Sequence, residues 1–526
     1  MRLRLPSRGL RDYGASMTQT RPTRLTRRAL LTGGACMFAA TAVAAPQQTL
    51  RPVARSVQPP VAATVDSGVR PVLRKEAVDL IAAAGLAGQV GFVIADHTTG
   101  EILEAVDATT ARPPASVTKA LTTLYALETL GADHRFVTRI LATGPLTDGV
   151  LDGDLILAGG GDPTLLTDDL AALADSVLAA GVRQVKGRFL VWGNALPGER
   201  EIEPGQLDQL DYNPSLGGLN LNFNRVFFEW ARSGADYTVS MDARSDTRRP
   251  PVTVARMQVV DRSLPVYTYT EGRAVDEWTV ARGALGKAGS RWLPVRFPTL
   301  YAGEVFRTLA QDAGIALPAA VEVQDLPVGR EIARFESVPL RDMLRTMLLY
   351  STNLTAEVVG MTATAQTRDL PESMRTSARL MASWLADRAG IAPQLADHSG
   401  LSDANRISAG DMVALLNAPG VEDRMHPLMK SIAMVDDARR AIPDFPASVQ
   451  AKTGTLNFVS TLAGYMRTDT GRTLSFAIFA FDPAARDASL SSLDEQPAGA
   501  AGFNGKAKRL QQDLLQRWAV LGRISG

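Results

Sequence analysis

Residues 113–124 constrain the local fold more tightly than any other part of this 526-residue chain. Two adjacent prolines keep the start of the segment extended, because a residue before proline avoids helical backbone angles and proline itself suits a helix start. Apolar side chains then recur at helical spacing, at Val117, Ala120, Leu121, Leu124 and Leu127. The pattern predicts an amphipathic helix that ends near Gly131.

Ser116 falls in the first turn of this expected helix, and Lys119 lies one turn further on. The free backbone N–H groups and the positive end of the helix dipole favour a negative charge that develops there. A spacing of three residues places the lysine amine beside the serine hydroxyl. Because a serine needs a neighbouring base to become a nucleophile, a desolvated lysine could be that base. Taken alone, the spacing also fits a helix-capping serine followed by a solvated lysine.

Lysine is scarce in this chain, which makes its positions informative. Of the 56 basic residues, eight are lysine and 48 are arginine. Arginine keeps its proton in proteins, whereas lysine can release it. The formal net charge of +1 gives no reason to expect a nucleic acid or an acidic partner. The four histidines show no metal-ligand spacing, and no G-x-S-x-G pattern occurs.

Residues 1–45 are predicted to be an export signal peptide of the twin-arginine type. Arg27 and Arg28 precede a moderately apolar run, and Ala-Val-Ala at 42–44 is a cleavage pattern. The run is too short and too rich in small residues to favour a membrane span. Lipid attachment through Cys36 is the poorer alternative, because glycines at 33 and 34 stand where a larger apolar residue is needed. We therefore expect an exported, periplasmic protein with no stable membrane anchor.

The rest of the chain divides into a linker, a catalytic part in two pieces and an insertion. Residues 46–72 are rich in proline, valine and alanine, which is typical of a linker. Residues 73–136 and 336–526 are predicted to form the catalytic domain. Residues 137–335 alternate short strand-like runs with turns, which predicts one or more inserted strand-rich domains.

Two loops invite functional interpretations that their residues do not support. The glycine run at 159–161 looks like a phosphate cradle, but no Gly-Lys-Ser/Thr follows and Pro163 removes a donor. Residues 397–402 place His398 beside Ser399, but adjacent side chains point in different directions. Structural turns are predicted at both places.

The elements predicted at the two ends of the chain indicate the fold class. A helix at 75–84 and strands at 89–95 and 101–108 are predicted near the start. Strands at 448–456, 459–467 and 472–481 and a helix at 506–520 are predicted at the end. Helices at both ends with an antiparallel sheet between them predict an α/β sandwich.

Three motifs occur once each and in a fixed order: Ser-x-x-Lys at Ser116, Ser-x-Asn at Ser351 and Lys-Thr-Gly at Lys452. Each alone fits a bland explanation, namely a helix cap, an Asn-containing loop and a strand end. Together they match the elements of penicillin-binding proteins and β-lactamases. Both motif lysines stand in a chain that otherwise prefers arginine about six to one, which supports the match.

The chain resembles the low-molecular-mass class C penicillin-binding proteins, the D-alanyl-D-alanine carboxypeptidase/endopeptidases. The resemblance covers nearly all of the expected mature chain and includes the boxes at 114–119, 159–165, 351–357, 399–402 and 452–456. It implies a β-lactamase/transpeptidase-like α/β sandwich with a large insertion, which the 235-residue gap between Ser116 and Ser351 accommodates. Two departures are His398, where the family usually has glycine, and Thr352 inside Ser-x-Asn. Neither departure removes a catalytic atom.

The resemblance also implies the site. The implied catalytic residues are Ser116, Lys119, Ser351, Asn353 and Lys452, and the implied substrate-binding residues are Thr453, Gly454 and Thr455. The implied substrates are peptidoglycan stem peptides, with β-lactam antibiotics as inhibitors and with no metal or organic cofactor.

The resemblance further implies a division of labour. Ser116 would attack the penultimate D-alanine carbonyl, and Lys119 would accept its proton. Ser351 would relay a proton to the leaving amine, with Asn353 positioning the network. Lys452 would add positive charge near the substrate carboxylate. The hydroxyls at 453 and 455 would receive that carboxylate, and the N–H groups of residues 116 and 455 would bind the oxyanion.

Three alternatives stay open at this point. One is a β-lactamase or esterase on the same fold, although the Tyr-x-Asn pattern of one lactamase class fails because Thr352 follows Tyr350 at the second place. Another is a protein that binds a β-lactam or muropeptide without turnover, against which the intact set of motif residues argues. The third concerns preference, since nothing in the sequence separates carboxypeptidase from endopeptidase activity.

The export signal makes a prediction about the mature protein. We expect the secreted chain to begin near Ala45 and to carry no lipid, because a cleavage pattern ends at residue 44. N-terminal sequencing of the exported protein checks this. A diacylated N-terminus at Cys36 would show that the lipoprotein alternative is the correct one.

Overall fold

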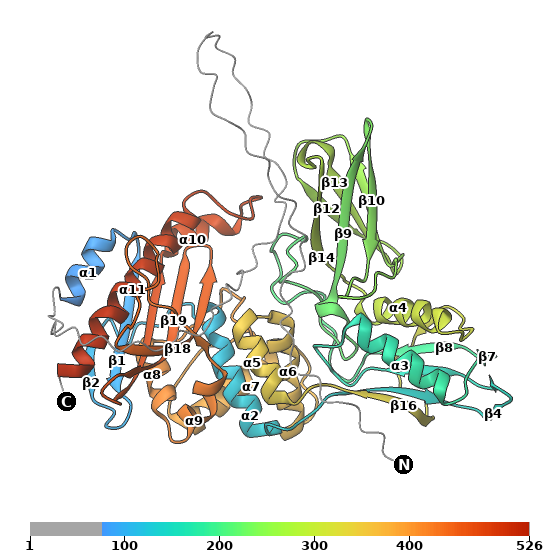
Figure 1. Cartoon of the computed structure of the whole chain (residues 1–526), viewed down its shortest axis with the longest axis horizontal. Helices are drawn as coiled ribbons and strands as arrows, with labels where there is room; N and C mark the ends of the chain where they lie inside the picture. The colour runs from blue at the N-terminus through green and yellow to red at the C-terminus, as the bar shows by residue number, and fades with distance from the viewer. Residues whose placement is uncertain (1–75, 525–526) are drawn as a thin grey trace, which may run out of the picture.

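A six-stranded antiparallel sheet, built from both ends of the chain, carries the fold (Figure 1). The computed structural model describes residues 76–524, so the predicted signal peptide and linker lie outside it. The strand order is β17-β18-β19-β20-β1-β2. The strands are β1 (Gln89–Asp96), β2 (Ile102–Val106), β17 (Lys430–Ser431), β18 (Ala447–Leu456), β19 (Val459–Thr468) and β20 (Thr473–Phe481). The predicted strands and the predicted α/β sandwich are confirmed.

One face of the sheet is covered by the two terminal helices, α1 (Ala77–Ala84) and α11 (Ala500–Ile524). Trp518 on α11 is fully buried and lies 5.4 Å from the ring of Phe92 and 5.9 Å from the ring of Phe476. Such aromatic pairs stabilise a core by about 0.5–1.5 kcal/mol beyond their buried area. α11 begins six residues before the predicted start at 506, and this early part borders a groove that is also lined by Thr453, Gly454 and Thr455 of β18.

The other face packs against helices that hold the second core of the sandwich. They are α2 (Thr118–Leu130), α5 (Leu340–Tyr350), α6 (Asn353–Thr367), α7 (Met374–Ala389), α8 (Ala409–Asn417) and α9 (Val421–Met425). The prediction that α2 is amphipathic is wrong, because every residue from Thr118 to Ala126 is buried. Its interior threonines are satisfied by hydrogen bonds: Thr122 Oγ1 donates to the His398 carbonyl at 2.6 Å and Thr123 Oγ1 to the Lys119 carbonyl at 2.7 Å.

The region between α2 and α5 has its own core and its own sheets. A five-stranded sheet has the order β15-β8-β6-β3-β16. Its strands are β3 (Val137–Ala142), β6 (Leu155–Ala158), β8 (Phe189–Trp192), β15 (Ala320–Glu322) and β16 (Arg330–Glu336), with α3 (Thr167–Ala179) and α4 (Pro298–Asp312) nearby. β4 (Leu146–Thr147), β5 (Val150–Leu151) and β7 (Gln184–Val185) form a small extra sheet.

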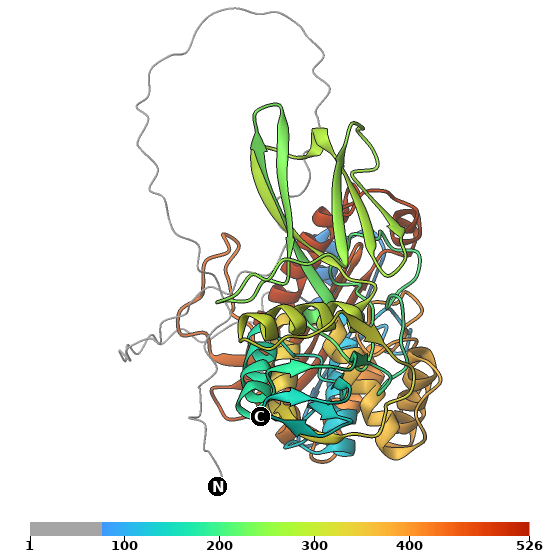
Figure 2. The ribbon, with the colours of Figure 1, turned by 90° about the vertical axis from the view of Figure 1, so that its right-hand side faces the viewer.

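Two three-stranded sheets project from this region (Figure 2). They have the orders β10-β9-β14 and β11-β13-β12. Their strands are β9 (Arg225–Ser233), β10 (Asp236–Asp242), β11 (Ala255–Val260), β12 (Tyr267–Glu271), β13 (Asp276–Ala281) and β14 (Ala288–Pro294). The first and last strands of the region, β3 and β16, pair antiparallel with Val137 opposite Glu336. We propose on this basis that residues 137–335 form an insertion whose two ends leave and rejoin the catalytic part side by side.

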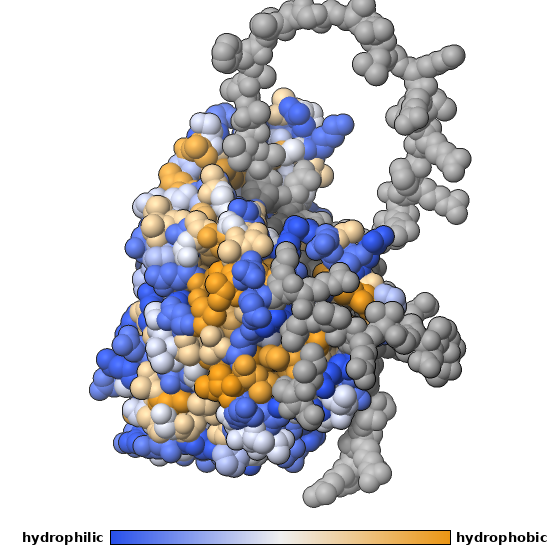
Figure 3. All heavy atoms as spheres, turned by 90° about the vertical axis from the view of Figure 1, so that its left-hand side faces the viewer, coloured by the Kyte–Doolittle hydropathy of each residue, from blue (hydrophilic) through white to orange (hydrophobic). Residues whose placement is uncertain are grey.

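The face formed by α1, β2 and α11 carries apolar side chains scattered among charged ones (Figure 3). Val78 on α1 and Ile102 on β2 are exposed there. Within residues 76–524, no helix combines the length and the apolar character needed to cross a membrane.

His398 is a structural residue that packs into the helical core. Its ring is fully buried, and Nε2 lies 2.8 Å from the hydroxyl of Ser377 on α7. Burial lowers the pKa of His398 to about 3, so the imidazole is neutral at physiological pH. The ring abuts Gly360 on α6, where an added Cβ would lie 2.3 Å from His398 Cγ. The histidine beside it thus explains a glycine within a helix. The hydroxyl that His398 Nε2 contacts belongs to Ser377 on α7 and not to a serine of the 397–402 loop, where a structural turn was predicted.

Gly360→Ala tests the contact. We expect it to lower the free energy of unfolding by about 1–2 kcal/mol, because overpacking outweighs the helix propensity that alanine gains. The measurement is urea unfolding of Gly360→Ala, His398→Ala and the double variant. The double variant should recover most of the loss caused by the alanine, and a neutral Gly360→Ala would contradict the packing.

Candidate active site

The three sequence motifs meet at the edge of the six-stranded sheet. Ser116 lies in a short 3-10 turn, η1 (Ala115–Val117), directly before α2. Lys119, one turn along, places Nζ 3.0 Å from Ser116 Oγ. The same amine donates to Asn353 Oδ1 at 2.7 Å and to the Ser399 carbonyl at 2.7 Å. The side chain is therefore fixed by three partners from three separate segments.

The backbone around Ser116 is held in a strained turn. Ala115 has a φ of +46°, in the left-handed region that residues other than glycine rarely adopt. Gly400 has a φ of +82°, and a Cβ there would lie 1.8 Å from the Ala115 carbonyl oxygen. On the other side, a Cβ on Gly454 would lie 2.7 Å from the Pro114 carbonyl oxygen. Two glycines thus allow the sheet and the 397–402 loop to close around the turn.

Ser351 and Asn353 lie on the connection between α5 and α6. Ser351 ends α5 with a φ of +62°, and its Oγ accepts a hydrogen bond from Lys452 Nζ at 3.0 Å. Asn353 begins α6, and its Nδ2 donates to the Tyr212 carbonyl at 2.8 Å. The connection therefore links one residue to each motif lysine, since Ser351 contacts Lys452 and Asn353 contacts Lys119.

Lys452 reaches the site from β18 and is buried. Besides Ser351, its amine donates to the Thr453 carbonyl at 2.8 Å. Burial, together with the positive charges of Lys119 and Lys430, holds the pKa of Lys452 well below its ordinary value. Within residues 76–524, no carboxylate forms an ion pair with this lysine. Its charge is therefore left for a bound ligand to stabilise.

The strand that carries Lys452 has an open outer edge. Thr453 and Thr455 are exposed, whereas Gly454 between them is buried against the Ser116 turn. β17 pairs with β18 only at Lys430–Ala451 and Ser431–Gln450. Among the strands of the described chain, none covers the outer edge beyond Ala451. An extended peptide can therefore pair along this edge.

Burial and two nearby carboxylates have opposite effects on the pKa of Lys119. Burial lowers the pKa of Lys119 to about 8, while the negative charges of Asp397 and Glu357 oppose that shift. The charged neighbours that act on the pKa of Lys119 are both carboxylates. The cation–cation effect appears instead on Lys452. A pKa near 8 leaves a useful fraction of the amine unprotonated at neutral pH.

Several residues of the site were missed by sequence reasoning. Glu357 accepts backbone hydrogen bonds from His398 and Ser399 at 2.9 and 2.8 Å, which holds the Ser399 carbonyl against Lys119. Burial, followed by the charge of Asp397, raises the pKa of Glu357 to about 8. The available signal was the spacing of Asn353 and Glu357, four residues apart on one helix. The carbonyls of Ser399 and Tyr212 leave no such signal, because any residue supplies one.

The described part of the chain holds no cluster of three or more His, Cys, Asp or Glu side chains able to bind a metal.

Comparison with known protein families shows which family the chain belongs to. A family model described as the D-Ala-D-Ala carboxypeptidase 3 (S13) family matches residues 74–496. The chain belongs to this family. The protein is accordingly a serine-type D-Ala-D-Ala carboxypeptidase, a hydrolase, and the resemblance to class C penicillin-binding proteins is confirmed.

Individual members of the family resemble the chain over most of its length. It is 28% identical over 444 residues to a D-alanyl-D-alanine carboxypeptidase from Actinomadura sp., which covers 78% of this chain and 81% of the relative. It is 26% identical over 411 residues to the D-alanyl-D-alanine carboxypeptidase DacB of Haemophilus influenzae, covering 74% and 85%. The crystal structure of penicillin binding protein 4 (dacB) from H. influenzae superposes with a TM-score of 0.68 at 20% identity, covering 84% of this chain and 99% of that one. This likeness confirms the fold.

The two lysines of this carboxypeptidase should respond differently to arginine. Lys119→Arg should lower acylation by at least about 10²-fold, because arginine keeps the charge but cannot accept the Ser116 proton. Lys452→Arg should keep measurable acylation, since arginine also supplies positive charge, and Lys452→Ala should be much slower. Rates with a fluorescent penicillin measure all three.

The wild-type protein supplies the control. Its acylation rate constant should rise with pH through about 8, because Lys119 must lose its proton before it can accept another. A Lys119→Arg variant that acylates as fast as wild type would show that Lys119 is not the base.

Proposed function

We propose that this carboxypeptidase removes the terminal D-alanine from peptidoglycan stem peptides through an acyl-enzyme on Ser116. The observation that carries the proposal is the contact between Ser116 Oγ and the buried Lys119 Nζ, 3.0 Å apart. A serine becomes a nucleophile when a base of suitable pKa lies within hydrogen-bond distance. The lowered pKa of Lys119, about 8, meets that requirement.

Acylation follows from the geometry of the two lysines. Lys119 takes the Ser116 proton as Oγ attacks the carbonyl carbon of the penultimate D-alanine. The negative charge that develops on that carbonyl oxygen would be stabilised by the backbone N–H groups of Ser116 and Thr455. The C–N bond then breaks, and the leaving amine receives a proton through Ser351, whose Oγ is held by Lys452 Nζ. Water hydrolyses the ester and regenerates the serine.

Substrate binding uses the open edge of β18. The peptide would lie along this edge, with its terminal carboxylate at the hydroxyls of Thr453 and Thr455. A carboxylate there would stabilise the charged form of Lys452, whose pKa is otherwise lowered by burial. Gly454 allows the strand to pass close to the Ser116 turn. This arrangement favours a peptide that ends in a free carboxylate.

The cell-wall substrate and the N-terminal sequence together support an exported protein. We propose that residues 1–45 direct export to the periplasm by the twin-arginine route. We also propose that β-lactams inhibit the protein by acylating Ser116. Penicillin binding protein 4 from H. influenzae, which shares this fold, has been crystallised in complex with a β-lactam.

Turnover and labelling test the proposal together. The mature protein should release D-alanine from a pentapeptide that ends in D-Ala-D-Ala, and Ser116→Ala should abolish that release. Mass spectrometry of a penicillin-treated digest should place the adduct on the peptide containing Ser116. An adduct on another residue, or D-alanine release that survives Ser116→Ala, would overturn the assignment.

A further inference from the structure

A loop between β8 and β9 reaches the residues that surround the nucleophile. Residues 200–213, which we call the 200–213 loop, contain neither helix nor strand. Near the end of this loop, the Tyr212 carbonyl accepts the 2.8 Å hydrogen bond from Asn353 Nδ2. The oxygen of the same carboxamide, Asn353 Oδ1, accepts from Lys119 Nζ at 2.7 Å. Because one end of the carboxamide donates and the other accepts, the position of Tyr212 fixes the end that faces Lys119.

A buried arginine holds the backbone of the 200–213 loop. A loop without regular structure needs other groups to satisfy its backbone carbonyls. The side chain of Arg296 does this from the segment that follows β14. Its guanidinium donates to the carbonyls of Arg200, Asp208 and Asn213 at 2.9, 3.2 and 2.8 Å. The loop is thereby held as one unit, so a shift of one part moves Tyr212 as well.

Glu495 joins this loop to the C-terminal part of the chain. It lies in the connection between α10 (Pro483–Leu490) and α11. Its Oε1 accepts from Arg291 Nη1 on β14 and from Gln209 Nε2 in the loop, both at 3.0 Å. Arg291 Nη2 also donates to the Gln209 carbonyl at 3.1 Å, which closes a ring of three residues. The side chain of Arg291 is 1% exposed and that of Glu495 19%. Removal of the carboxylate would leave a buried positive charge without its partner.

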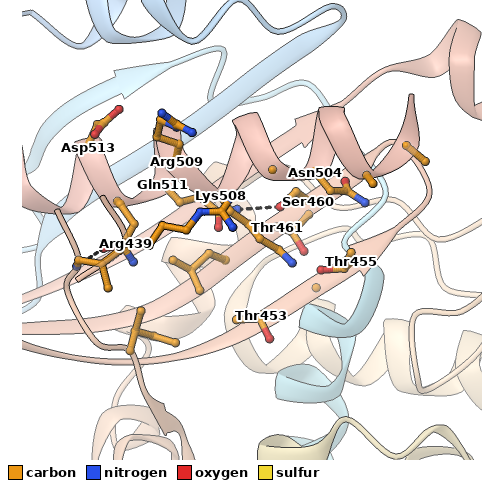
Figure 4. A pocket seen from close by; sticks show the side chains of 18 of the residues that line it. Arg439, Thr453, Thr455, Ser460, Thr461, Asn504, Lys508, Arg509, Gln511 and Asp513 are labelled. Atoms are coloured by element: carbon orange, nitrogen blue, oxygen red, sulfur yellow. Dashed lines mark hydrogen bonds between the residues drawn. The ribbon is translucent and has the colours of Figure 1, made fainter. Parts of the chain in front are cut away.

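The connection that carries Glu495 also borders the strand of the Lys-Thr-Gly motif. Gln496, the next residue, lines the same groove as Thr453 and Thr455 of β18 (Figure 4). Asn504 of α11 lies at this groove too, and its Nδ2 donates to the carbonyl of Leu456, the last residue of β18, at 2.9 Å. The ring around Glu495 therefore ties the 200–213 loop to the neighbourhood of β18.

We propose that Glu495 is a positioning residue for the acylation of Ser116, because it holds the 200–213 loop in the place from which that loop orients Asn353. The side chain of Glu495 contacts Arg291 and Gln209 and acts through them. The inference rests on the proposed function, since it assigns a role in the same reaction. Glu495 lies outside the three sequence motifs.

Glu495→Ala tests this role in the mature protein. The variant loses the acceptor of both hydrogen bonds, so the rate constant for acylation by a fluorescent penicillin should fall by about tenfold, because small misplacements of positioning groups slow a reaction strongly. Glu495→Gln keeps an oxygen that can accept both hydrogen bonds and should lose less than about threefold. The values of kcat/KM for a D-Ala-D-Ala pentapeptide should follow the same order. Rate constants are measured per active site, so a smaller folded fraction does not change them.

The pH profile separates positioning from a loss of stability. Asn353 Oδ1 stabilises the charged Lys119 amine by accepting a hydrogen bond from it, so loss of this contact should lower the pKa of Lys119 further. The midpoint of the acylation profile, about 8 in the wild type, should therefore move to lower pH in Glu495→Ala while the plateau falls. A residue that only stabilised the fold would leave the midpoint in place.

Glu104→Ala is the matched control. Glu104 on β2 pairs with Arg517 at 2.8 Å, and the two side chains are comparably buried. β2 lies at the opposite edge of the six-stranded sheet from β17 and β18. The variant should lower the free energy of unfolding, but its acylation rate constant should stay within about twofold of wild type and its pH midpoint should not move, since distant sites act independently.

Gln209→Leu is a milder second variant, should Glu495→Ala fold poorly. It removes one contact of Glu495 and leaves the ion pair with Arg291 in place. The acylation rate constant should fall by about two- to threefold, because one hydrogen bond of the ring is lost. The pH midpoint should move in the same direction as in Glu495→Ala.

The outcomes distinguish this inference from the proposed function. If the wild type is not acylated at Ser116, the proposed function fails and the inference fails with it. If the wild type is acylated and Glu495→Ala matches it in rate, or is slower with an unmoved midpoint, the positioning role is overturned and the proposed function stands. An equal loss in Glu104→Ala, or a Glu495→Gln variant as slow as Glu495→Ala, would overturn the positioning role as well.

Discussion

The buried amine of Lys119 is the interaction on which the rest of the site depends. A lysine without solvent access needs hydrogen-bond partners, and this one takes Ser116 Oγ, Asn353 Oδ1 and the Ser399 carbonyl. Each partner comes from a different segment, so the amine can be satisfied only when α2, the start of α6 and the 397–402 loop are all in place. The same burial that demands those partners lowers the pKa to about 8. The burial of Lys119 in the folded protein is thus also what prepares this amine to activate Ser116.

Much of the fold and of the candidate site could be predicted from the sequence, because these parts have recognisable local sequence patterns. The strands at both chain ends alternate or run apolar, and α7 was predicted at 374–389, as observed. Ser116, Lys119, Ser351 and Lys452 were found because their spacing and chemistry are unusual in a chain rich in arginine. The prediction that α2 is amphipathic was wrong, because tertiary packing surrounds that helix on all sides. The Ser399 carbonyl contacts Lys119 because of the way the chain folds. Every residue type has a backbone carbonyl, so no sequence pattern predicts this contact.

Small residues decide how closely the segments approach the nucleophile. Gly400 and Gly454 flank the Ser116 turn, and a Cβ at either position would meet backbone oxygen of Ala115 or Pro114. At a distance from the site, Gly360 makes room for the ring of His398. His398, one of the two departures from the resemblance, packs inside the helical core, with Nε2 2.8 Å from the Ser377 hydroxyl. In this structure the departure is a packing feature of the helical core.

The two motif lysines share burial but differ in what surrounds them. Lys119 lies near Glu357 and Asp397, so its charged form is partly stabilised by the protein. Among the described residues, the charges that act on Lys452 are those of other lysines, and its amine is held by the neutral Ser351 hydroxyl and the Thr453 carbonyl. On the proposed mechanism, the anion that Lys452 lacks arrives with the substrate as the terminal carboxylate. A ligand without that carboxylate would leave the Lys452 charge uncompensated, which costs binding energy in a buried site. On this mechanism the site therefore discriminates at the binding step. It favours a ligand with a free carboxylate over a neutral ester of similar size before any bond is broken.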